Sequence, residues 1–101
     1  MENPERIHFV TGRLAEKALT EEVNRLSEKI GFQATVEVLP ISVAALMTPR
    51  WIAGKINIPP GTDRVIVPGY CEHLAELQSL TTAVVETGPR DLRRLAEYFG
   101  L

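Results

Sequence analysis

Val65-Ile66-Val67 is the stretch that decides the fold, because three consecutive apolar residues stand between two turn sequences. Pro59-Pro60-Gly61-Thr62-Asp63 precedes the run and Pro68-Gly69 follows it, and residues of these types favour turns. A strand that is apolar at every position has both faces buried, which is typical of parallel sheets covered by helices. Ala83-Val84-Val85 repeats the pattern further along the chain. The two runs therefore predict strands of a parallel α/β sheet.

The remaining strands and the longest helix follow from their own patterns. Residues 6–10 predict a first strand, 34–39 a second and 82–86 a fourth, with 64–67 as the third. After the first strand, apolar residues recur at helical spacing with charged residues on the opposite face, which predicts an amphipathic helix. Its apolar positions are Leu14, Ala18, Leu19, Val23, Leu26 and Ile30, and Gly31 is placed to end it.

Shorter helical segments complete the alternation of strands and helices. Ser42 could cap a short apolar helix over 43–47, and Thr48-Pro49 is typical of a fresh helix start that carries Trp51 and Ile52. Because proline interrupts a continuous helix, we expect a kinked or double helix there. Two more helices are predicted by Leu74, Leu77 and Leu80 and by Leu92, Leu95, Ala96 and Phe99.

This alternation predicts right-handed crossovers and an α/β three-layer sandwich. We expect a single domain over residues 1–101, with a four-stranded parallel sheet and helices on both faces. The expected strand order is 2-1-3-4, as in flavodoxin-like and half-Rossmann arrangements. A split α+β sheet with one antiparallel strand is the alternative, because the sequence pattern does not exclude it.

Composition narrows the class of protein further. The chain has 101 residues, 45% of them hydrophobic and 24% charged, and a formal net charge of −2. A net charge of this sign does not indicate the strongly basic domain or face that nucleic-acid binding usually needs. No apolar stretch is long enough to cross a membrane. The N-terminus has no signal-peptide pattern, and the one cysteine cannot form an internal disulfide. The sequence therefore predicts a cytoplasmic protein that binds neither nucleic acid nor a membrane.

Candidate ligand-binding residues gather where the predicted strand order reverses. In open parallel sheets, ligands bind beyond the carboxyl ends of the strands at this point. For the order 2-1-3-4 the crevice lies between the first and third strands, so 11–13 and 68–71 are its expected walls, with 40–42 and 87–89 as neighbours. The candidate ligand-binding residues are Thr11, Gly12, Arg13, Ser42, Gly69, Tyr70 and Cys71.

Arg13 and Cys71 carry the sharpest chemical hypotheses at this edge. Arg13 could hold a phosphate or carboxylate together with backbone N–H groups at a helix start, or it could be a solvated side chain after a tight turn. Cys71 could be a nucleophile, or it could be a small buried hydrophobe, which is the alternative we expect. His73 is close to Cys71 in sequence, but this spacing does not establish a Cys/His pair.

The other chemistry-bearing residues favour structural roles. One cysteine and two distant histidines fall short of a metal site, and His8 is expected to be a satisfied core or edge histidine. The glycine motifs of dinucleotide and P-loop sites are absent. The carboxylates lack the pairing that a general acid and base need; they are Glu72, Glu76, Glu86 and Asp91.

Two further groups of residues are also expected to be structural. The basic cluster Arg90, Arg93 and Arg94 is offset by nearby acidic residues, which is typical of a solvated face. Trp51 and Met47 stand at helical spacing among apolar neighbours and are expected in the core.

Three blocks of the sequence carry a family resemblance. They read RIHFVTGRLA over 6–15, VEVLPISVAALMT over 36–48 and PPGTDRVIVPGYC over 59–71, with GPRDL over 88–92 and YFG over 98–100 added to them. Together these blocks resemble the N-terminal domain of the dihydropteroate synthase-related proteins, a domain of unknown function. The resemblance extends over nearly the whole chain.

The resemblance implies a larger protein around this domain. In that family the domain precedes a pterin-binding (β/α)₈ barrel, and the proteins are associated with the tetrahydromethanopterin-linked one-carbon pathway. Residues 1–101 are then expected to be the excised N-terminal domain of such a protein, with the barrel as its partner. No cofactor and no metal is expected in this domain, because the pterin would be held by the barrel alone.

Three hypotheses about function remain open at this point. The leading hypothesis is a non-catalytic accessory domain that binds a small anionic ligand, or docks on the barrel, through the loops at the strand ends. The alternative is a stand-alone enzyme that acts on a one-carbon or pterin pathway intermediate through Cys71 or the Arg13 loop. The third is a structural module that forms homo-oligomers, which an exposed apolar patch around Trp51 and Ile52 would favour.

Overall fold

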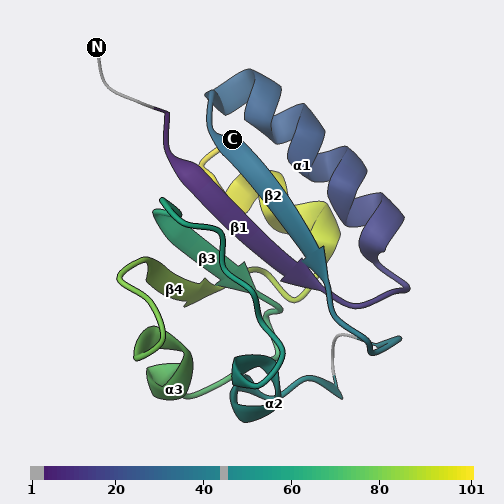
Figure 1. The fold of residues 1–101 in the computed structure, drawn as a ribbon. Helices are drawn as coiled ribbons and strands as arrows, with labels where there is room; N and C mark the ends of the chain where they lie inside the picture. Colours follow the sequence, from purple (N-terminus) through teal and green to yellow (C-terminus); the bar gives the residue numbers. More distant parts are fainter. Residues whose placement is uncertain (1–3, 44–45) are drawn as a thin grey trace.

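A computed structural model describes residues 4–43 and 46–101 and shows a four-stranded sheet with helices on both faces (Figure 1). The strands are β1 (Arg6–Thr11), β2 (Gln33–Val38), β3 (Arg64–Val67) and β4 (Val84–Thr87). Their order is 2-1-3-4, and β1 pairs in parallel with β2 and with β3, as β3 does with β4. The predicted parallel α/β sheet is confirmed, and the alternative with an antiparallel strand is wrong.

One face of the sheet packs against the first and last helical segments of the chain. These are α1 (Glu16–Ile30), the 3₁₀ helix η2 (Leu92–Arg94) and α4 (Leu95–Tyr98). The core of this α1–α4 face combines strand residues Ile7, Phe9 and Ile66 with helix residues such as Leu26 and Leu95. The rings of Phe32 and Phe99 stack with centroids 5.2 Å apart and tie the start of β2 to the end of α4.

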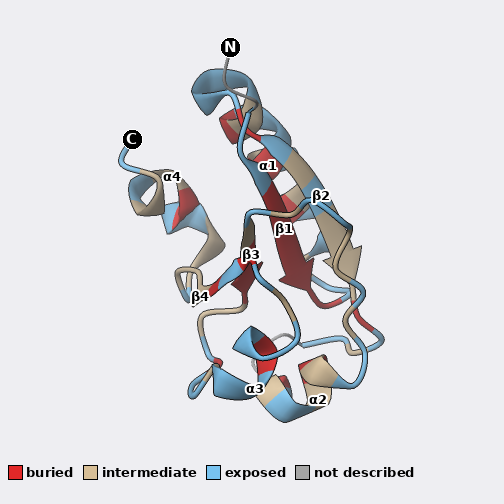
Figure 2. Ribbon diagram, turned by 60° about the vertical axis from the view of Figure 1, so that its left-hand side comes forward, coloured by how far each residue is buried: buried red, intermediate tan, exposed pale blue. Residues whose placement is uncertain are grey.

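The opposite face packs against α2 (Pro49–Ala53) and α3 (Ala75–Gln78). Its core joins the alternate residues of β3, Val65 and Val67, to Ile52 of α2 and Leu77 of α3. The central strand β1 is buried along most of its length, whereas the outer surfaces of the helices are exposed (Figure 2). Because β3 contributes to both cores, its unbroken apolar sequence is explained by burial on two sides.

Local signals fix the ends of two helices where they were expected. Gly31 follows α1 with φ of 95°, a conformation that favours glycine, and its N–H donates to the carbonyl of Ser27. The hydroxyl of Thr48 accepts from the backbone N–H of Trp51 at 3.2 Å, with Pro49 in the first turn of α2. The predicted short helix over 43–47 includes residues 44 and 45, which lie outside the described residues.

Two further observations bear on the predictions. The last helical segment is one turn of 3₁₀ helix followed by one turn of α-helix rather than a continuous α-helix. Within the ranges 4–43 and 46–101, no helix combines the length and the apolar character that a membrane span requires.

Candidate functional site

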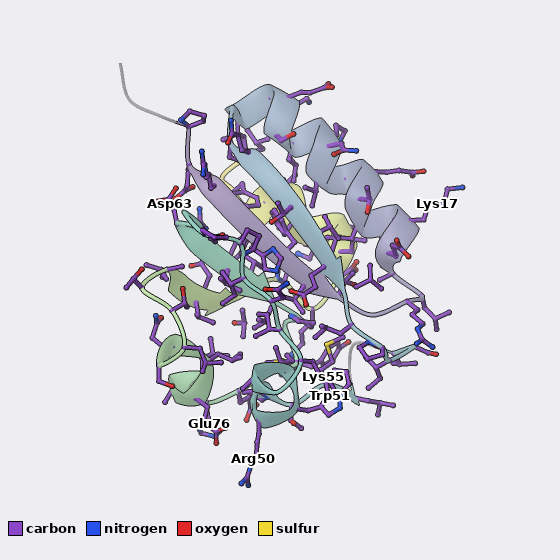
Figure 3. All side chains as sticks on the ribbon, in the orientation of Figure 1. Lys17, Arg50, Trp51, Lys55, Asp63 and Glu76 are labelled. Carbon is purple, nitrogen blue, oxygen red and sulfur yellow. The ribbon has the colours of Figure 1, made fainter. Side chains whose placement is uncertain are left out.

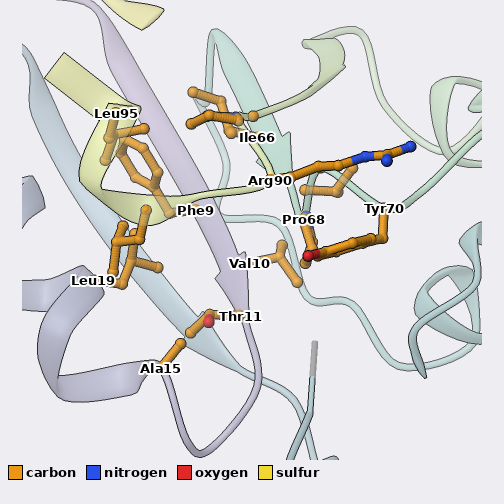
Figure 4. Close-up of a pocket in the computed structure, with 15 residues that line it drawn as sticks. Phe9, Val10, Thr11, Ala15, Leu19, Ile66, Pro68, Tyr70, Arg90 and Leu95 are labelled. Carbon is orange, nitrogen blue, oxygen red and sulfur yellow. The ribbon is translucent and has the colours of Figure 1, made fainter. Parts of the chain in front are cut away.

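A cavity of about 110 Å³ lies at the carboxyl ends of β1 and β3 (Figure 4). We call it the strand-end cavity. Its floor is apolar and comes from the α1–α4 face, and its rim carries Thr11, Tyr70 and Arg90. The apolar residues of this face that line it include Phe9, Leu19, Ile66, Leu92 and Leu95. The two loops predicted as walls of the crevice are therefore neighbours, as the pairing of β1 with β3 requires.

The topology explains why the cavity opens at this point. From the end of β1 the chain enters α1 and crosses toward β2, whereas β3 is followed by β4 on its other side. The chain after β4 then returns over β3 as η2 and α4. Because α1 leads toward β2 whereas η2 and α4 return over β3, the apolar floor at the junction of β1 and β3 is left partly uncovered.

Gly69 builds the wall on the β3 side by allowing two loops to touch. A Cβ atom at this position would lie 2.6 Å from the carbonyl oxygen of Gly88 and 2.7 Å from the backbone nitrogen of Arg90. Real side chains do not tolerate such contacts with backbone, so only glycine fits here without a shift of the loop. Gly69 thereby holds the segment with Tyr70 against the segment with Arg90.

Arg90 borders the strand-end cavity, and its exposed side chain extends outward from the cavity over Tyr70 (Figure 4). Its Cζ atom lies 5.3 Å from the centroid of the Tyr70 ring, a cation–π arrangement. No ion pair to Arg90 is found among the described residues, whereas Arg93 pairs with Asp91 at 2.8 Å and Arg94 with Glu97 at 2.9 Å. Arg93 and Arg94 are therefore offset by acidic residues as expected, whereas Arg90 has no such ion pair among the described residues and borders the cavity.

Thr11 places a hydroxyl at the opposite side of the strand-end cavity from Arg90 (Figure 4). It is the last residue of β1, it shares its face with Phe9 by strand alternation, and only 4% of its surface is exposed. Within the described chain, its hydroxyl makes no hydrogen bond to protein.

The predicted site residues divide into two groups. Thr11, Gly69 and Tyr70 line the strand-end cavity, whereas Gly12, Arg13, Ser42 and Cys71 are not among its lining residues. Gly12 is buried directly after β1. The exposed Arg13 donates its backbone N–H to the carbonyl of Ile41 at 2.8 Å and borders a separate hollow along α1. The exposed Ser42 accepts from the backbone N–H of Leu14 at 3.1 Å through its carbonyl.

Cys71 lies in the core of the sheet face that packs against α2 and α3, the α2–α3 face. It is 4% exposed, and its Sγ atom faces the carbonyl oxygen of Met47 at 3.9 Å. Burial raises the pKa of the Cys71 thiol above its ordinary value, which disfavours the nucleophilic thiolate. His73 is exposed with φ of 57°. This environment is the one expected of Cys71 as a small buried hydrophobe rather than as a nucleophile.

His8 is the centre of a hydrogen-bonded cluster on the α2–α3 face. Its Nδ1 lies 2.6 Å from the hydroxyl of Thr35, and its Nε2 lies 2.8 Å from Oε1 of Glu37. Glu37 also accepts from the backbone N–H of Asn57 at 3.1 Å, which ties the loop before β3 to β2. The prediction of a satisfied histidine is confirmed. Groups of three or more metal-ligating side chains are not found in the described ranges.

Trp51 and Ile52 do not form the exposed apolar patch that an oligomer interface would need. Ile52 is fully buried, and Trp51 packs against the core of the α2–α3 face. Arg50 points outward from the same helix (Figure 3). Exposed apolar side chains occur instead near the end of β1, at Leu14, Val43 and Leu46, with 76%, 43% and 70% of their surface exposed. We call these three residues the Leu14 patch.

Sequence reasoning missed Arg90 and the apolar floor of the strand-end cavity. Arg90 follows directly after 87–89, the turn predicted as a neighbour of the crevice, so its position in the loop after β4 was the available signal. The floor carried no separate signal, because Phe9, Leu19 and Leu95 have the same apolar pattern as any other core positions.

Comparison with known proteins gives a family and no function. A family of unknown function, DUF6513, matches residues 5–90 of the chain. The search of curated proteins found no match. The search of solved structures found none either. Because the matched segment spans both strand-end loops of the cavity and all four strands, the chain belongs to the DUF6513 family.

Proposed function

We propose that this chain is a non-catalytic accessory domain of a dihydropteroate synthase-like protein and that it binds a small anionic ligand in the strand-end cavity. The observation that carries this proposal is the rim of the cavity, where Arg90 has no acidic partner among the described residues. A guanidinium group beside an apolar pocket is suited to a carboxylate or phosphate. The position at the strand-order reversal agrees with where open parallel sheets bind ligands.

The lining of the strand-end cavity supports binding over catalysis. Among its described lining residues, the polar side chains are Thr11, Tyr70 and Arg90, with no carboxylate, histidine or cysteine. A threonine or tyrosine hydroxyl needs an adjacent base to act as a nucleophile, and no such base is found beside Thr11 or Tyr70 among the described lining residues. The alternative of a stand-alone enzyme acting through Cys71 is also disfavoured, because that thiol is buried in the other core.

The resemblance of the sequence blocks supports the accessory role, with the barrel of the same protein as partner and the pterin held there. The Leu14 patch favours docking on that barrel as a second function of the same edge, since exposed apolar side chains that cluster are typical of contact surfaces. We also propose a cytoplasmic location, which a single free cysteine supports.

A titration of the isotopically labelled chain tests the proposal. Amide chemical shifts would be followed while acetate, inorganic phosphate, cyclohexanecarboxylate or neutral cyclohexanemethanol is added. We expect at least one anion to shift the amides of Thr11, Gly69 and Gly88 in a saturable way, and we expect Arg90→Gln to weaken this response.

Arg93→Gln is the matched control, because Arg93 lies three residues away and is paired with Asp91 outside the cavity. If every anion leaves the cavity amides unchanged, or if Arg93→Gln weakens binding as much as Arg90→Gln does, the proposed anion site is wrong.

A further inference from the structure

The two edges of the sheet differ in how their backbone groups are used. β2 and β4 are the outer strands, so each has one side without a neighbouring strand (Figure 1). An unpaired strand edge is a template for pairing with another chain unless the protein protects it. We propose that the edge of β2 binds a second copy of this chain, with the two β2 strands antiparallel about Val36. This interface does not depend on the proposed ligand site.

The edge of β4 is closed by side chains. The carboxamide of Gln78 donates to the carbonyl of Ala83 at 2.6 Å and accepts from the backbone N–H of Val85 at 2.9 Å. The hydroxyl of Thr81 accepts from the backbone N–H of Ala83 at 3.0 Å. The residue between Ala83 and Val85 donates toward β3, so a further strand beside β4 would need the groups that are already paired with Gln78 and Thr81.

The edge of β2 has no such protection. Gln33 and Leu39 donate their backbone N–H groups toward β1 at 2.8 and 2.9 Å. Because alternate residues of a strand face alternate sides, Ala34, Val36 and Val38 direct their N–H and C=O groups outward. Within the described ranges these groups have no hydrogen-bond partner. β2 also contains no lysine, no proline and no bulge, which are common means of blocking a strand edge.

The outward groups of β2 are complementary to those of a second, antiparallel β2. With Val36 opposite Val36 of the second copy, Ala34 lies opposite Val38 at each end of the pairing. Residues opposite each other in this way exchange two N–H···O hydrogen bonds, so every outward N–H and C=O of the three residues gains a partner. The edge thus matches a second copy of itself without any change in the fold.

Neighbouring registers are poorer. A shift of two residues in one direction puts Ala34 opposite Pro40, which has no N–H, and puts Glu37 opposite Glu37 of the second copy. The opposite shift puts Val38 opposite Phe32, which lies before the start of β2. The register centred on Val36 is therefore the one in which the backbone groups pair without repulsion between like charges.

The side chains of β2 fit the same register. Ala34 and Val36 pack against the core of the α1–α4 face, so the pair of Val36 side chains would extend that core across the interface. On the other face, Glu37 lies opposite Thr35 of the second copy. Because Gln78 and Thr81 cap the other edge of each sheet, pairing stops at two copies and gives a closed dimer rather than a filament.

Sedimentation and amide hydrogen exchange, both followed from micromolar to millimolar concentration, test the proposal. We expect an equilibrium of monomer and dimer without larger species. The amides of Ala34, Val36 and Val38 should exchange slowly only at the high concentrations, whereas those of Thr35 and Glu37, which face β1, should be protected throughout. A chain that stays monomeric, or whose three outward amides exchange at a rate independent of concentration, would overturn the proposal.

Proline substitutions locate the interface. Val36→Pro removes an outward N–H and no hydrogen bond between β1 and β2, and it should weaken the dimer about tenfold or more. Thr87→Pro is the matched control at an outward position of β4, and Leu14→Ser removes the most exposed side chain of the Leu14 patch. Both should leave the dissociation constant unchanged. If either weakens the dimer as much as Val36→Pro does, the interface lies elsewhere and the proposal is wrong.

A mixed sample of isotopically labelled and unlabelled chains tests the register without any substitution. Thr35 of one copy and Glu37 of the other form a pair without hydrogen bonds, in which Cα atoms approach to about 4.5 Å. We expect an intermolecular Overhauser contact between their α protons. A contact of Glu37 with Glu37, or intermolecular contacts confined to the Leu14 patch, would overturn the proposed pairing.

Discussion

Both faces of the sheet carry an apolar core, but they differ at the carboxyl edge. On the α2–α3 face, Val67, Cys71 and Leu77 form a continuous buried core up to the loop after β3. On the α1–α4 face, Phe9, Leu19 and Leu95 are buried but also border the strand-end cavity. An apolar core thus fills one face at this edge and leaves a pocket in the other, where the strand order reverses.

The polar groups of the two faces differ in the same way. His8 on the α2–α3 face has both ring nitrogens hydrogen-bonded to protein. Thr11 and Arg90 at the other face have no hydrogen-bonding or ionic partner among the described residues, and both line the strand-end cavity. The availability of a polar group, more than its chemical type, therefore distinguishes a candidate ligand contact from a structural one.

The largest expected effect comes from truncating one leucine on each face. Leu77→Ala in the closed core should lower the free energy of unfolding by about 3–4 kcal/mol, since the hole it leaves is enclosed. Leu95→Ala should cost less, about 2–3 kcal/mol, because its side chain already borders free space. Chemical denaturation of the two variants measures the difference. Equal losses would contradict the view that Leu95 borders free space whereas Leu77 is enclosed.

Gly69→Ala is expected to have the next largest effect. The added methyl group would collide with the backbone of Gly88 and Arg90, so the free energy of unfolding should fall by about 2–3 kcal/mol and the wall of the cavity should shift. Gly54→Ala is the matched control, because a Cβ there would meet the carbonyl of Trp51 at an ordinary 3.6 Å. A Gly69→Ala protein as stable as Gly54→Ala would contradict the close contact of the two loops.

His8→Ala tests whether the polar cluster on the closed face is structural. Loss of the ring would leave the Thr35 and Glu37 side chains without their partner, and we expect a loss of about 2 kcal/mol in stability. Anion binding at the strand-end cavity should be unchanged, because His8 is on the other face. The conservative Glu37→Gln should cost less, since it keeps an acceptor oxygen. Weaker anion binding in His8→Ala, with the fold intact, would refute this separation of roles.

Cys71→Ala should give the smallest effect, about 1–2 kcal/mol from lost packing. In the native protein the thiol should react with iodoacetamide near neutral pH only on unfolding. Because burial raises the pKa of the folded thiol, the unfolded state releases its proton first as the pH rises. The native chain should therefore lose more stability than Cys71→Ala on the alkaline side of the ordinary thiol pKa. Rapid alkylation of the folded chain would contradict a buried Cys71.

Much of the fold was predictable because its signals are local or periodic. Val65-Ile66-Val67 indicated a strand buried on both faces, and Thr48 and Gly31 marked the helix boundaries that the structure has. The alternation of strands and helices then limited the topology to very few arrangements. The turn of 3₁₀ helix before α4 was not predicted, since helix type at a chain end depends on packing more than on composition.

The candidate site was predictable only in its location. The strand-order rule places Thr11, Gly69 and Tyr70 at one edge, and the structure brings these residues to one cavity. The structure does not place Arg13 or Ser42 in this cavity. Backbone hydrogen bonds join residues 13–14 to residues 41–42, and neither Arg13 nor Ser42 lines the cavity. The role of Gly69 as a loop contact and the position of Arg90 on Tyr70 depend on distances between segments that no local pattern reports.

The most direct test of the central claim is a nuclear Overhauser experiment with cyclohexanecarboxylate and methyl-labelled protein. If the strand-end cavity is the binding site, the ring protons of the probe should contact the methyl groups of Leu19, Ile66 and Leu95. The methyl groups of Leu77 and Val65 on the closed face should show no contact. Contacts to the closed face, or to the Leu14 patch alone, would contradict the account.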